Sequence, residues 1–402
     1  MRVLLSTYGS RGDVEPLAGL AAELRQLGAE VRVCAPPDEE GNRRLTAVGA
    51  EVVPVGRSVR DLVSGPKPAT PANAPEVAAA LVTAQSEGLL PAAEDCDVLL
   101  ATGLFPAAAR TVAEQAGIRY VFATFIPGIL PSPYHPPLRR PGKPFPPGAD
   151  NRTLWGIDAE NLDALYSAPL NALRASVGLP RVDDLRAHVY TDQPWLASDP
   201  VLGPWREAPD LEVVRTGFWI LPDERPLPAD LEAFLDAGDP PVFVGFGSMP
   251  IRDPREASRI VVEAVRAQGR RAVVASGWGG IGPIDDGDDC FGVGEVNHQA
   301  LFRRVAVVVH HGGAGTTATA ARSGASQVVV PQMADQPYWA GRVADLGIGV
   351  AHDGPVPTFE SLSAAIETAL SAKTRERAAA VAAVIRTDGA AVAARLLLEG
   401  SR

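Results

Sequence analysis

Short apolar runs that alternate with amphipathic helical patterns constrain this chain more than any other feature of its sequence. Residues 2–7 (RVLLST) have the composition of a buried strand, and a turn at residues 8–13 follows them. Residues 30–35 (EVRVCA) predict the next strand. A strand, a helix and a strand in this order predict a βαβ unit with parallel strands and a right-handed crossover. The helical spacing between the two strands relates Leu17, Leu20, Ala21, Leu24 and Leu27, with Gly28 placed to end the helix.

The same alternation continues and then restarts after an irregular segment. Strands are predicted at 97–103 and 120–124, whereas residues 203–241 are rich in proline and in acidic side chains. The second series predicts strands at 242–248, 271–277, from 305 onward and at 327–331, followed by a mostly helical region at 358–399 with a break at Asp388-Gly389. The expected organisation is an N-terminal α/β domain at 1–216, a linker at 217–228, a second α/β domain at 229–385 and a C-terminal helix at 386–402 that could cross back to the first domain.

Charge and cysteine content exclude several classes of partner and compartment. The 402 residues carry a formal net charge of −11, which argues against duplex DNA or an anionic membrane as a partner. The three cysteines, Cys34, Cys96 and Cys290, have neither metal-site nor disulfide spacing, so a reducing cytoplasm is the expected location. The apolar run at the start of the chain is too short for a signal peptide. We expect a cytoplasmic protein, acting as a monomer.

The segment 305–317 (VAVVVHHGGAGTT) is the most informative motif. Adjacent histidines on an extended chain point to opposite faces, and no nearby Cys, Asp or His completes a ligand set, so we expect no metal site. A tight turn explains one glycine but not the whole pattern. A helix that starts near Gly315 would offer unpaired amides and a favourable dipole to an anion, and glycines let the backbone approach a phosphate closely. The loop lacks the lysine of a nucleoside-triphosphatase loop and the spacing of a dinucleotide site. It therefore predicts a bound diphosphate, with a simple tight turn as the alternative.

Two further regions suggest ligand contacts. Asp335 and Gln336, in 331–340 (PQMADQPYWA), follow a predicted buried strand and suit a polyhydroxylated ring, although a solvated loop is the alternative. In the proline-rich region 120–170, the aromatic side chains could line an acceptor cleft, and the alternative is that they are core and loop residues. The candidate cleft residues are Phe125, Tyr134 and Trp155.

The motif HHGGAGTT followed by P-x-x-x-D-Q resembles the nucleotide-sugar signature of GT-B glycosyltransferases that act on small molecules. The N-terminal segment 9–17 (GSRGDVEPL) looks like the matching end of that family. Residues 191–202 (TDQPWLASDPVL) and 219–227 (WILPDERPL) resemble the actinobacterial glycosyltransferases that decorate vancomycin-type glycopeptide antibiotics. The resemblance covers essentially the full chain. It implies two Rossmann-like parallel-sheet domains that face each other across a cleft.

The resemblance also implies roles for single residues. The C-terminal domain would hold a UDP- or dTDP-sugar, with Val296 as a backbone partner of the base and with Asp335 and Gln336 facing the sugar. The N-terminal domain would hold the acceptor, and Ser10 could reach the β-phosphate. The residues implied for the diphosphate in the second domain are Ser248, His311, Gly313, Ala314, Gly315 and Thr316.

Asp13 matches the family's candidate general base, which would take the proton of an acceptor hydroxyl while the anomeric configuration inverts, without a metal or another cofactor. The alternative is that Asp13 is the N-cap of the following helix or orients the substrate, and Asp335 stays open as another base. Many relatives have a histidine near this position, whereas residues 6–16 contain none.

The leading hypothesis is an inverting hexosyltransferase that moves a sugar from a UDP- or dTDP-sugar to a hydroxyl of a glycopeptide antibiotic aglycone or pseudo-aglycone, without nucleic-acid or membrane partners. A nucleotide-sugar epimerase of the same fold is one alternative, and a non-catalytic nucleotide-sugar-binding helper is another. The intact set of Ser10, Asp13, His311 and Asp335 argues against the helper.

Overall fold

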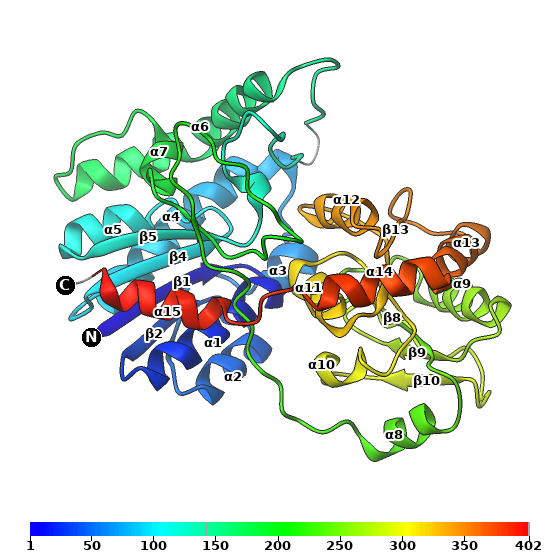
Figure 1. Cartoon of the computed structure of the whole chain (residues 1–402). Coiled ribbons are helices and arrows are strands. Elements are labelled where there is room, and N and C mark those ends of the chain that lie inside the picture. Colours follow the sequence, from blue (N-terminus) through cyan, green and yellow to red (C-terminus); the bar gives the residue numbers. More distant parts are fainter. Residues whose placement is uncertain (141–142, 401–402) are drawn as a thin grey trace. The chain divides into compact units, whose positions relative to one another are not determined.

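The computed structural model describes residues 1–140 and 143–400, and it divides the chain into two compact units (Figure 1). Unit 1 contains Met1–Pro200, Pro204–Leu221 and the segment from Arg386, and unit 2 contains Val201–Gly203 and Pro222–Ile385. Each unit is built around its own sheet with helices on its faces. The predicted α/β class with two parallel-sheet domains is therefore confirmed. Residues 401 and 402, at the end of the expected segment 386–402, lie outside the described residues.

Unit 1 has a seven-stranded sheet in the order β3-β2-β1-β4-β5-β6-β7, and every neighbouring pair is parallel. Its strands are β1 (Arg2–Tyr8), β2 (Glu30–Ala35), β3 (Glu51–Pro54), β4 (Val98–Gly103), β5 (Arg119–Thr124), β6 (Trp195–Leu196) and β7 (Val214–Arg215). Its helices are α1 (Arg11–Gln26), α2 (Glu39–Ala47), α3 (Val59–Ser64), α4 (Ala74–Ala92), α5 (Ala109–Ala116), α6 (Asn151–Ser176), α7 (Leu185–Tyr190) and α15 (Gly389–Glu399), with 3₁₀ turns η1 (Pro71–Asn73) and η2 (Pro127–Ile129).

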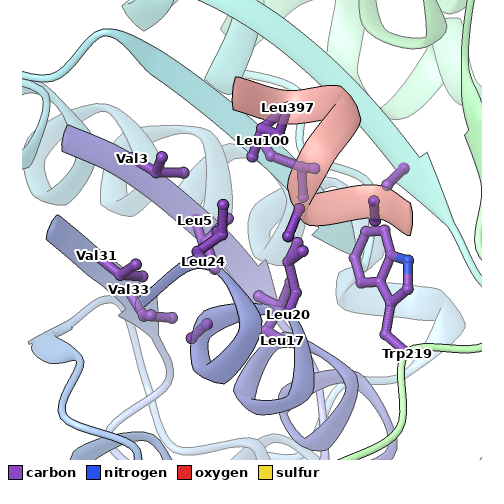
Figure 2. Packing of buried hydrophobic residues seen from close by; sticks show 14 of the residues in the cluster. Val3, Leu5, Leu17, Leu20, Leu24, Val31, Val33, Leu100, Trp219 and Leu397 are labelled. Atoms are coloured by element: carbon purple, nitrogen blue, oxygen red, sulfur yellow. The ribbon is translucent and has the colours of Figure 1, made fainter. Parts of the chain in front are cut away.

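Both faces of the central strands β1 and β4 are buried, which is why apolar residues follow one another in these strands instead of alternating with polar ones. Val3 and Leu5 of β1 face the α1 side, where they join the apolar side chains of the helix (Figure 2). Leu4 points to the opposite face and packs in a separate cluster with Leu99. The side chains that α1 contributes to the core are Leu17, Leu20, Ala21 and Leu24, at the spacing predicted from the sequence.

Helix α1 begins earlier than the sequence suggested. It starts at Arg11, so Ser10 is the N-cap and the turn after β1 is only two residues long. Asp13 lies inside the first turn, where its amide donates to the carbonyl of Ser10 at 2.9 Å. The hypothesis that Asp13 is the N-cap is therefore wrong, because the N-cap is Ser10, three residues before Asp13.

The C-terminal helix α15 is part of the core of unit 1. Figure 2 shows it beside α1, with Leu397 and Trp219 close to the α1 side chains. The Arg119 guanidinium donates to the carbonyl of Leu397 near the end of the helix. At the start of the helix, a Cβ on Gly389 would lie 2.4 Å from the carbonyl oxygen of Phe218, so only glycine fits this close approach.

Unit 2 has a six-stranded sheet in the order β10-β9-β8-β11-β12-β13, again parallel throughout. Its strands are β8 (Val242–Gly245), β9 (Ala272–Ala275), β10 (Cys290–Val293), β11 (Val307–His310), β12 (Ser326–Val329) and β13 (Gly349–Ala351). Its helices are α8 (Ala229–Asp236), α9 (Pro254–Ala267), α10 (His298–Leu301), α11 (Ala314–Ser323), α12 (Gln336–Asp345), α13 (Phe359–Leu370) and α14 (Ala372–Ala382).

The long segment of unit 2 begins at Pro222 and ends at Ile385. The side-chain amide of Asn297 holds the entering segment, because it donates to the carbonyls of Asp223 and Arg225 at 2.8 and 2.7 Å. Val201–Gly203, which the sequence assigned to the first domain, groups with unit 2. None of the helices in the described part of the chain combines the length and apolar character needed to cross a lipid bilayer.

Candidate functional site

The order of the strands in unit 2 reverses between β8 and β11. After β8 the chain builds the sheet outward through β9 and β10, then returns to place β11 on the other side of β8. In open parallel sheets, ligands bind beyond the carboxyl ends of the strands at such a reversal. The loops at this point are 246–250, after β8, and 311–313, after β11.

Helix α11 starts at this edge with unused donors. Gly313 is its N-cap and has no side chain to cap the first turn, and the carbonyl of Gly313 accepts from the amide of Thr317 at 3.0 Å. Within residues 1–140 and 143–400, no protein acceptor is bonded to the amides of Ala314, Gly315 or Thr316. Three donors at the positive end of a helix dipole suit an anion.

The His311 side chain lies between two of the glycines. A Cβ on Gly313 would lie 2.7 Å from Nε2 of His311, and a Cβ on Gly247 would lie 3.1 Å from its Cε1. The Nδ1 atom is shielded from solvent and has no hydrogen-bond partner among the described residues. Burial lowers the pKa of His311 to about 4, so the imidazole is neutral near pH 7. His311 can therefore offer one N–H group to a ligand, but not a positive charge.

The loop after β8 brings Ser248 to the same edge of the sheet. The strand ends at Gly245, earlier than the predicted 242–248, because Gly247 turns the chain with a φ of 56°. Ser248 is half-buried in this turn, and its hydroxyl makes no hydrogen bond within the part of the chain that the structure describes. The hydroxyl is thus available to a ligand of the α11 site.

Asp335 is the residue before α12 and has an unusual environment. Its Oδ2 accepts from Nε1 of Trp339 at 2.7 Å, one helical turn further on. Burial raises the pKa of Asp335 to about 6, although the bond from Trp339 opposes the shift. The preceding Ala334 has a φ of 53°, a conformation that costs free energy for a residue with a side chain. The sequence analysis missed this pair, which the i, i+4 spacing of Asp335 and Trp339 could have indicated.

Gln336 is buried and is used mainly by its own loop. Its Oε1 accepts from the amides of Gln332 and Met333 at 2.7 and 3.1 Å, and its Nε2 donates to Sδ of Met249 at 3.3 Å. The side-chain oxygen therefore organises the loop after β12, and one N–H of the amide is left for other contacts.

Val296 lies between β10 and α10, and its side chain is packed in the core with Phe243, Leu301 and Phe302. Only its backbone can then contact a nucleobase. In the part of the chain that the structure describes, no group of three or more His, Cys, Asp or Glu side chains could hold a metal ion.

In unit 1, Ser10 and Asp13 lie just after β1, beside the reversal of strand order between β1 and β4. The Ser10 side chain does not cap α1. A Cβ on Gly9 would lie 2.0 Å from Oδ2 of Asp13, so the carboxyl group occupies the space above this glycine. Both side chains are half-buried and accessible in part to solvent.

The three candidate cleft aromatics have different environments. Phe125 is packed in the core edge-to-face with Trp219, at 5.6 Å between ring centroids. Trp155 is also buried, and its Nε1 donates to the carbonyl of His135 at 2.9 Å. Only Tyr134 is exposed, with the guanidinium carbon of Arg206 at 3.7 Å from its ring centroid. Contrary to the expectation of an aromatic cleft, Phe125 and Trp155 pack as core residues.

Comparisons with known proteins agree with this architecture. Residues 288–393 match a family described as the C-terminal domain of erythromycin biosynthesis protein CIII-like proteins, and residues 16–159 match a glycosyl transferase 4-like domain. The chain is 55% identical to glycosyltransferase GtfE of Amycolatopsis orientalis, over 99% of this chain and 97% of the relative. It is 53% identical to a vancomycin aglycone glucosyltransferase of the same organism, with the same coverage of both chains.

Solved structures share the fold at low sequence identity. The glycotransferase of kitacinnamycin superposes with a TM-score of 0.73 at 22% identity, covering 99% of this chain and 98% of that one. The glycosyltransferase VinC, solved in complex with dTDP, superposes with a TM-score of 0.69 at 19% identity, covering 100% and 99%. The fold is therefore GT-B.

Asp335 gives the site a pH signature. Because the folded state holds this proton more tightly than the unfolded chain, the corresponding stability is present below about pH 4 and is lost as the pH rises through about 6. Asp335→Asn keeps an acceptor for Trp339 and removes the ionisation. We expect the thermal stability of the variant, relative to the native protein, to increase by the equivalent of about 2–3 kcal/mol between about pH 4 and pH 7. A difference that is constant across this range, measured by calorimetry, would contradict the buried state of Asp335.

Proposed function

This chain belongs to the glycosyltransferase family of the glycopeptide-antibiotic enzymes and is a hexosyltransferase, and from this we propose its reaction. It transfers a sugar from a UDP- or dTDP-sugar to a hydroxyl of a glycopeptide aglycone or pseudo-aglycone. The transfer inverts the anomeric configuration and uses no metal ion. The similarity to a vancomycin aglycone glucosyltransferase supports the acceptor class. The dTDP complex of VinC, which has the same fold, supports the donor class. We further propose that the protein acts as a cytoplasmic monomer, without nucleic-acid or membrane partners.

The observation that carries the proposal is the pairing of unused amides with a neutral imidazole. A nucleoside diphosphate is the leaving group in this reaction, and negative charge grows on its β-phosphate as the glycosidic bond to the sugar breaks. The amides of Ala314, Gly315 and Thr316 are pre-oriented donors for that charge, and they need no reorganisation during the reaction. His311 adds an N–H donor from the same edge.

The other candidate residues have roles in the same step. Ser248 has a hydroxyl that can donate to the diphosphate, and the backbone near Val296 serves the base. For Ser10, a contact with the β-phosphate is implied by the family resemblance. Asp335 and the remaining N–H of Gln336 can hold hydroxyls of the donor sugar. This division of roles explains why the residues belong to several loops that follow parallel strands rather than to one motif.

Asp13 supplies the base in this proposal. Its carboxylate takes the proton of the acceptor hydroxyl, the oxygen of that hydroxyl forms a bond to the anomeric carbon, and the nucleoside diphosphate leaves with the electrons of the broken bond. Attack opposite the leaving group inverts the anomeric configuration. The position of Asp13 above Gly9 keeps the carboxyl group at the carboxyl edge of β1 rather than on the side of α1. Asp335 is the alternative base, because a pKa near 6 makes it more basic than an ordinary aspartate and still leaves most of it ionised at neutral pH.

His311→Ala should weaken the binding of UDP and dTDP and lower kcat/KM about 10²-fold, because one donor to the developing charge is lost. Calorimetric titration with each nucleotide and product formation followed by mass spectrometry measure the two effects. His352→Ala is the control, since His352 is a buried histidine of the same unit that bonds to Gly354 and Ser361 instead. Native-like binding and turnover in His311→Ala would remove the phosphate role.

Asp13→Asn should lower kcat about 10²–10⁴-fold and leave nucleotide affinity unchanged, because the base is lost while the donor site in unit 2 is intact. The rate of the native protein should fall at low pH as the base is protonated. Steady-state kinetics across pH should show that Asp13→Asn lacks this fall. Glu23→Gln is the control, because it removes a carboxylate from the same helix near its other end. This variant should retain native rates. If the rate of Asp13→Asn falls only as far as its folded fraction does, Asp13 has a structural role and another base must act.

Turnover should survive complete removal of divalent cations, because hydrogen bonds from amides, hydroxyls and imidazole stabilise the charge of the leaving group in place of a metal. Initial rates would be compared with and without an excess of chelator, with a donor panel of UDP- and dTDP-sugars. A loss of activity that added Mg²⁺ restores would show that the metal-independent mechanism is wrong.

A further inference from the structure

The histidine before the proposed phosphate ligand is fully buried and has two partners. His310 is the last residue of β11 and is 0% exposed. Its Nδ1 accepts from the amide of Gly312 at 3.1 Å, and its Nε2 lies 2.9 Å from Oε1 of Gln327 on β12. Both residues lie on the sheet face occupied by Val308 and Phe243. A polar pair is thus built into an apolar layer.

The hydrogen bonds define the state of the ring. Because the backbone amide of Gly312 can only donate, Nδ1 of His310 must be the acceptor and the ring hydrogen must be on Nε2. Gln327 then has to present its oxygen, as it does. Only a neutral imidazole with the hydrogen on Nε2 satisfies both partners.

His310 contacts the backbone of both loops that carry candidate ligands, through its ring on one side and its carbonyl on the other. Gly312 has a φ of 94°, and a Cβ there would lie 2.7 Å from Cγ1 of Val329. The backbone carbonyl of His310 accepts from the amide of Val330 at 2.8 Å, and Val330 directly precedes the 331–336 loop. The residue on the other side of Gly312 is Gly313, the N-cap of α11. The His310 side chain therefore holds the turn between His311 and the first amides of α11.

Stability alone does not account for this pair. The Nε2 atom of Gln327 is buried and has no hydrogen-bond partner among the described residues, a desolvation cost that two apolar side chains would avoid. Burial lowers the pKa of His310 to about 3, and the nearby His311 and His298 oppose its protonation as well. The ring is therefore a permanent hydrogen-bond acceptor for Gly312 at any physiological pH.

We propose that His310 is a positioning residue for the diphosphate site: through its bond to the Gly312 amide it orients His311 and the first amides of α11. The inference rests on the proposed function, since it assumes that this edge binds the nucleoside diphosphate. His310 does not touch the ligand in this arrangement. Gln327 contributes indirectly, because its oxygen keeps the ring hydrogen on Nε2.

A matched pair of variants separates the two hydrogen bonds of the ring. In His310→Asn, the side-chain oxygen can replace Nδ1 as the acceptor for Gly312. In His310→Gln, the amide can replace Nε2–H as the donor to Gln327, but no acceptor remains near Gly312. We expect His310→Gln to weaken UDP and dTDP binding about tenfold or more, and His310→Asn to stay within about threefold of the native protein. Isothermal titration with each nucleotide gives the affinities, and calorimetry gives the thermal stability of every variant.

His352→Gln is the control for burial, because His352 is another buried histidine with two side-chain hydrogen bonds in unit 2. It should lose thermal stability without losing nucleotide affinity. Native-like binding by His310→Gln would overturn the inference, as would affinities in the two His310 variants that simply follow their thermal stabilities. If the native protein itself binds neither nucleotide, the proposed function fails instead.

Two measurements keep the inference testable if His310→Gln does not fold. Gln327→Met removes the acceptor of the ring hydrogen at similar volume, and its nucleotide affinity should fall by several-fold; native affinity would count against the proposed chain of contacts. Nitrogen NMR of the native protein should show His310 neutral, with its hydrogen on Nε2, from about pH 5 to about pH 8. A hydrogen on Nδ1 would exclude the bond from Gly312 and overturn the inference.

Discussion

The uncapped start of α11 is the feature on which the chemistry of unit 2 depends. A helix whose first amides have no protein acceptor pays a cost unless another group satisfies them, and Gly313 has no side chain to do so. The parallel sheet brings the loop after β8 to the same place, because β8 and β11 are neighbours although Val307 follows Gly245 by 62 positions in the sequence. The site is thus a product of strand order as much as of the glycine motif.

Two adjacent histidines divide the work at this edge. The His310 side chain bonds to its own loop and to β12. His311 lies against Gly247 and Gly313, and its Nδ1 has no hydrogen-bond partner in the part of the chain that the structure describes. Burial favours the neutral form of both rings. A neutral donor is well suited to a diphosphate that must be released after each turnover, because it binds the anion without the strong attraction of a full positive charge.

Unit 1 shows how a distant segment can support a candidate catalytic turn. Asp13 belongs to the first turn of α1, and the apolar side of that helix packs against α15 from the end of the chain (Figure 2). Leu397 and Trp219 belong to the same buried cluster as Leu17 and Leu20 of α1. The position of Asp13 therefore depends on residues that lie more than 200 positions away in the sequence.

Local patterns were enough to predict many of the elements and the main motif from the sequence, although the short strands β3, β10 and β13 were not among the predicted ones. The spacing of Leu17, Leu20 and Leu24 determined a helix, and the run before His310 determined a strand, because periodicity and burial act over a few neighbouring residues. The glycines after His311 similarly indicated a close backbone approach. What the sequence could not determine were features that arise from long-range contacts.

The tertiary structure alone decided that Phe125 and Trp155 are core residues, that the oxygen of Gln336 serves its own loop and that Gln327 partners His310. It also placed Asp335 where burial raises its pKa. An aromatic or amide side chain has the same composition whether it lines a ligand site or packs inside the protein. Only the arrangement of strands and helices around it determines which polar atoms are satisfied by the protein and which are left for a ligand.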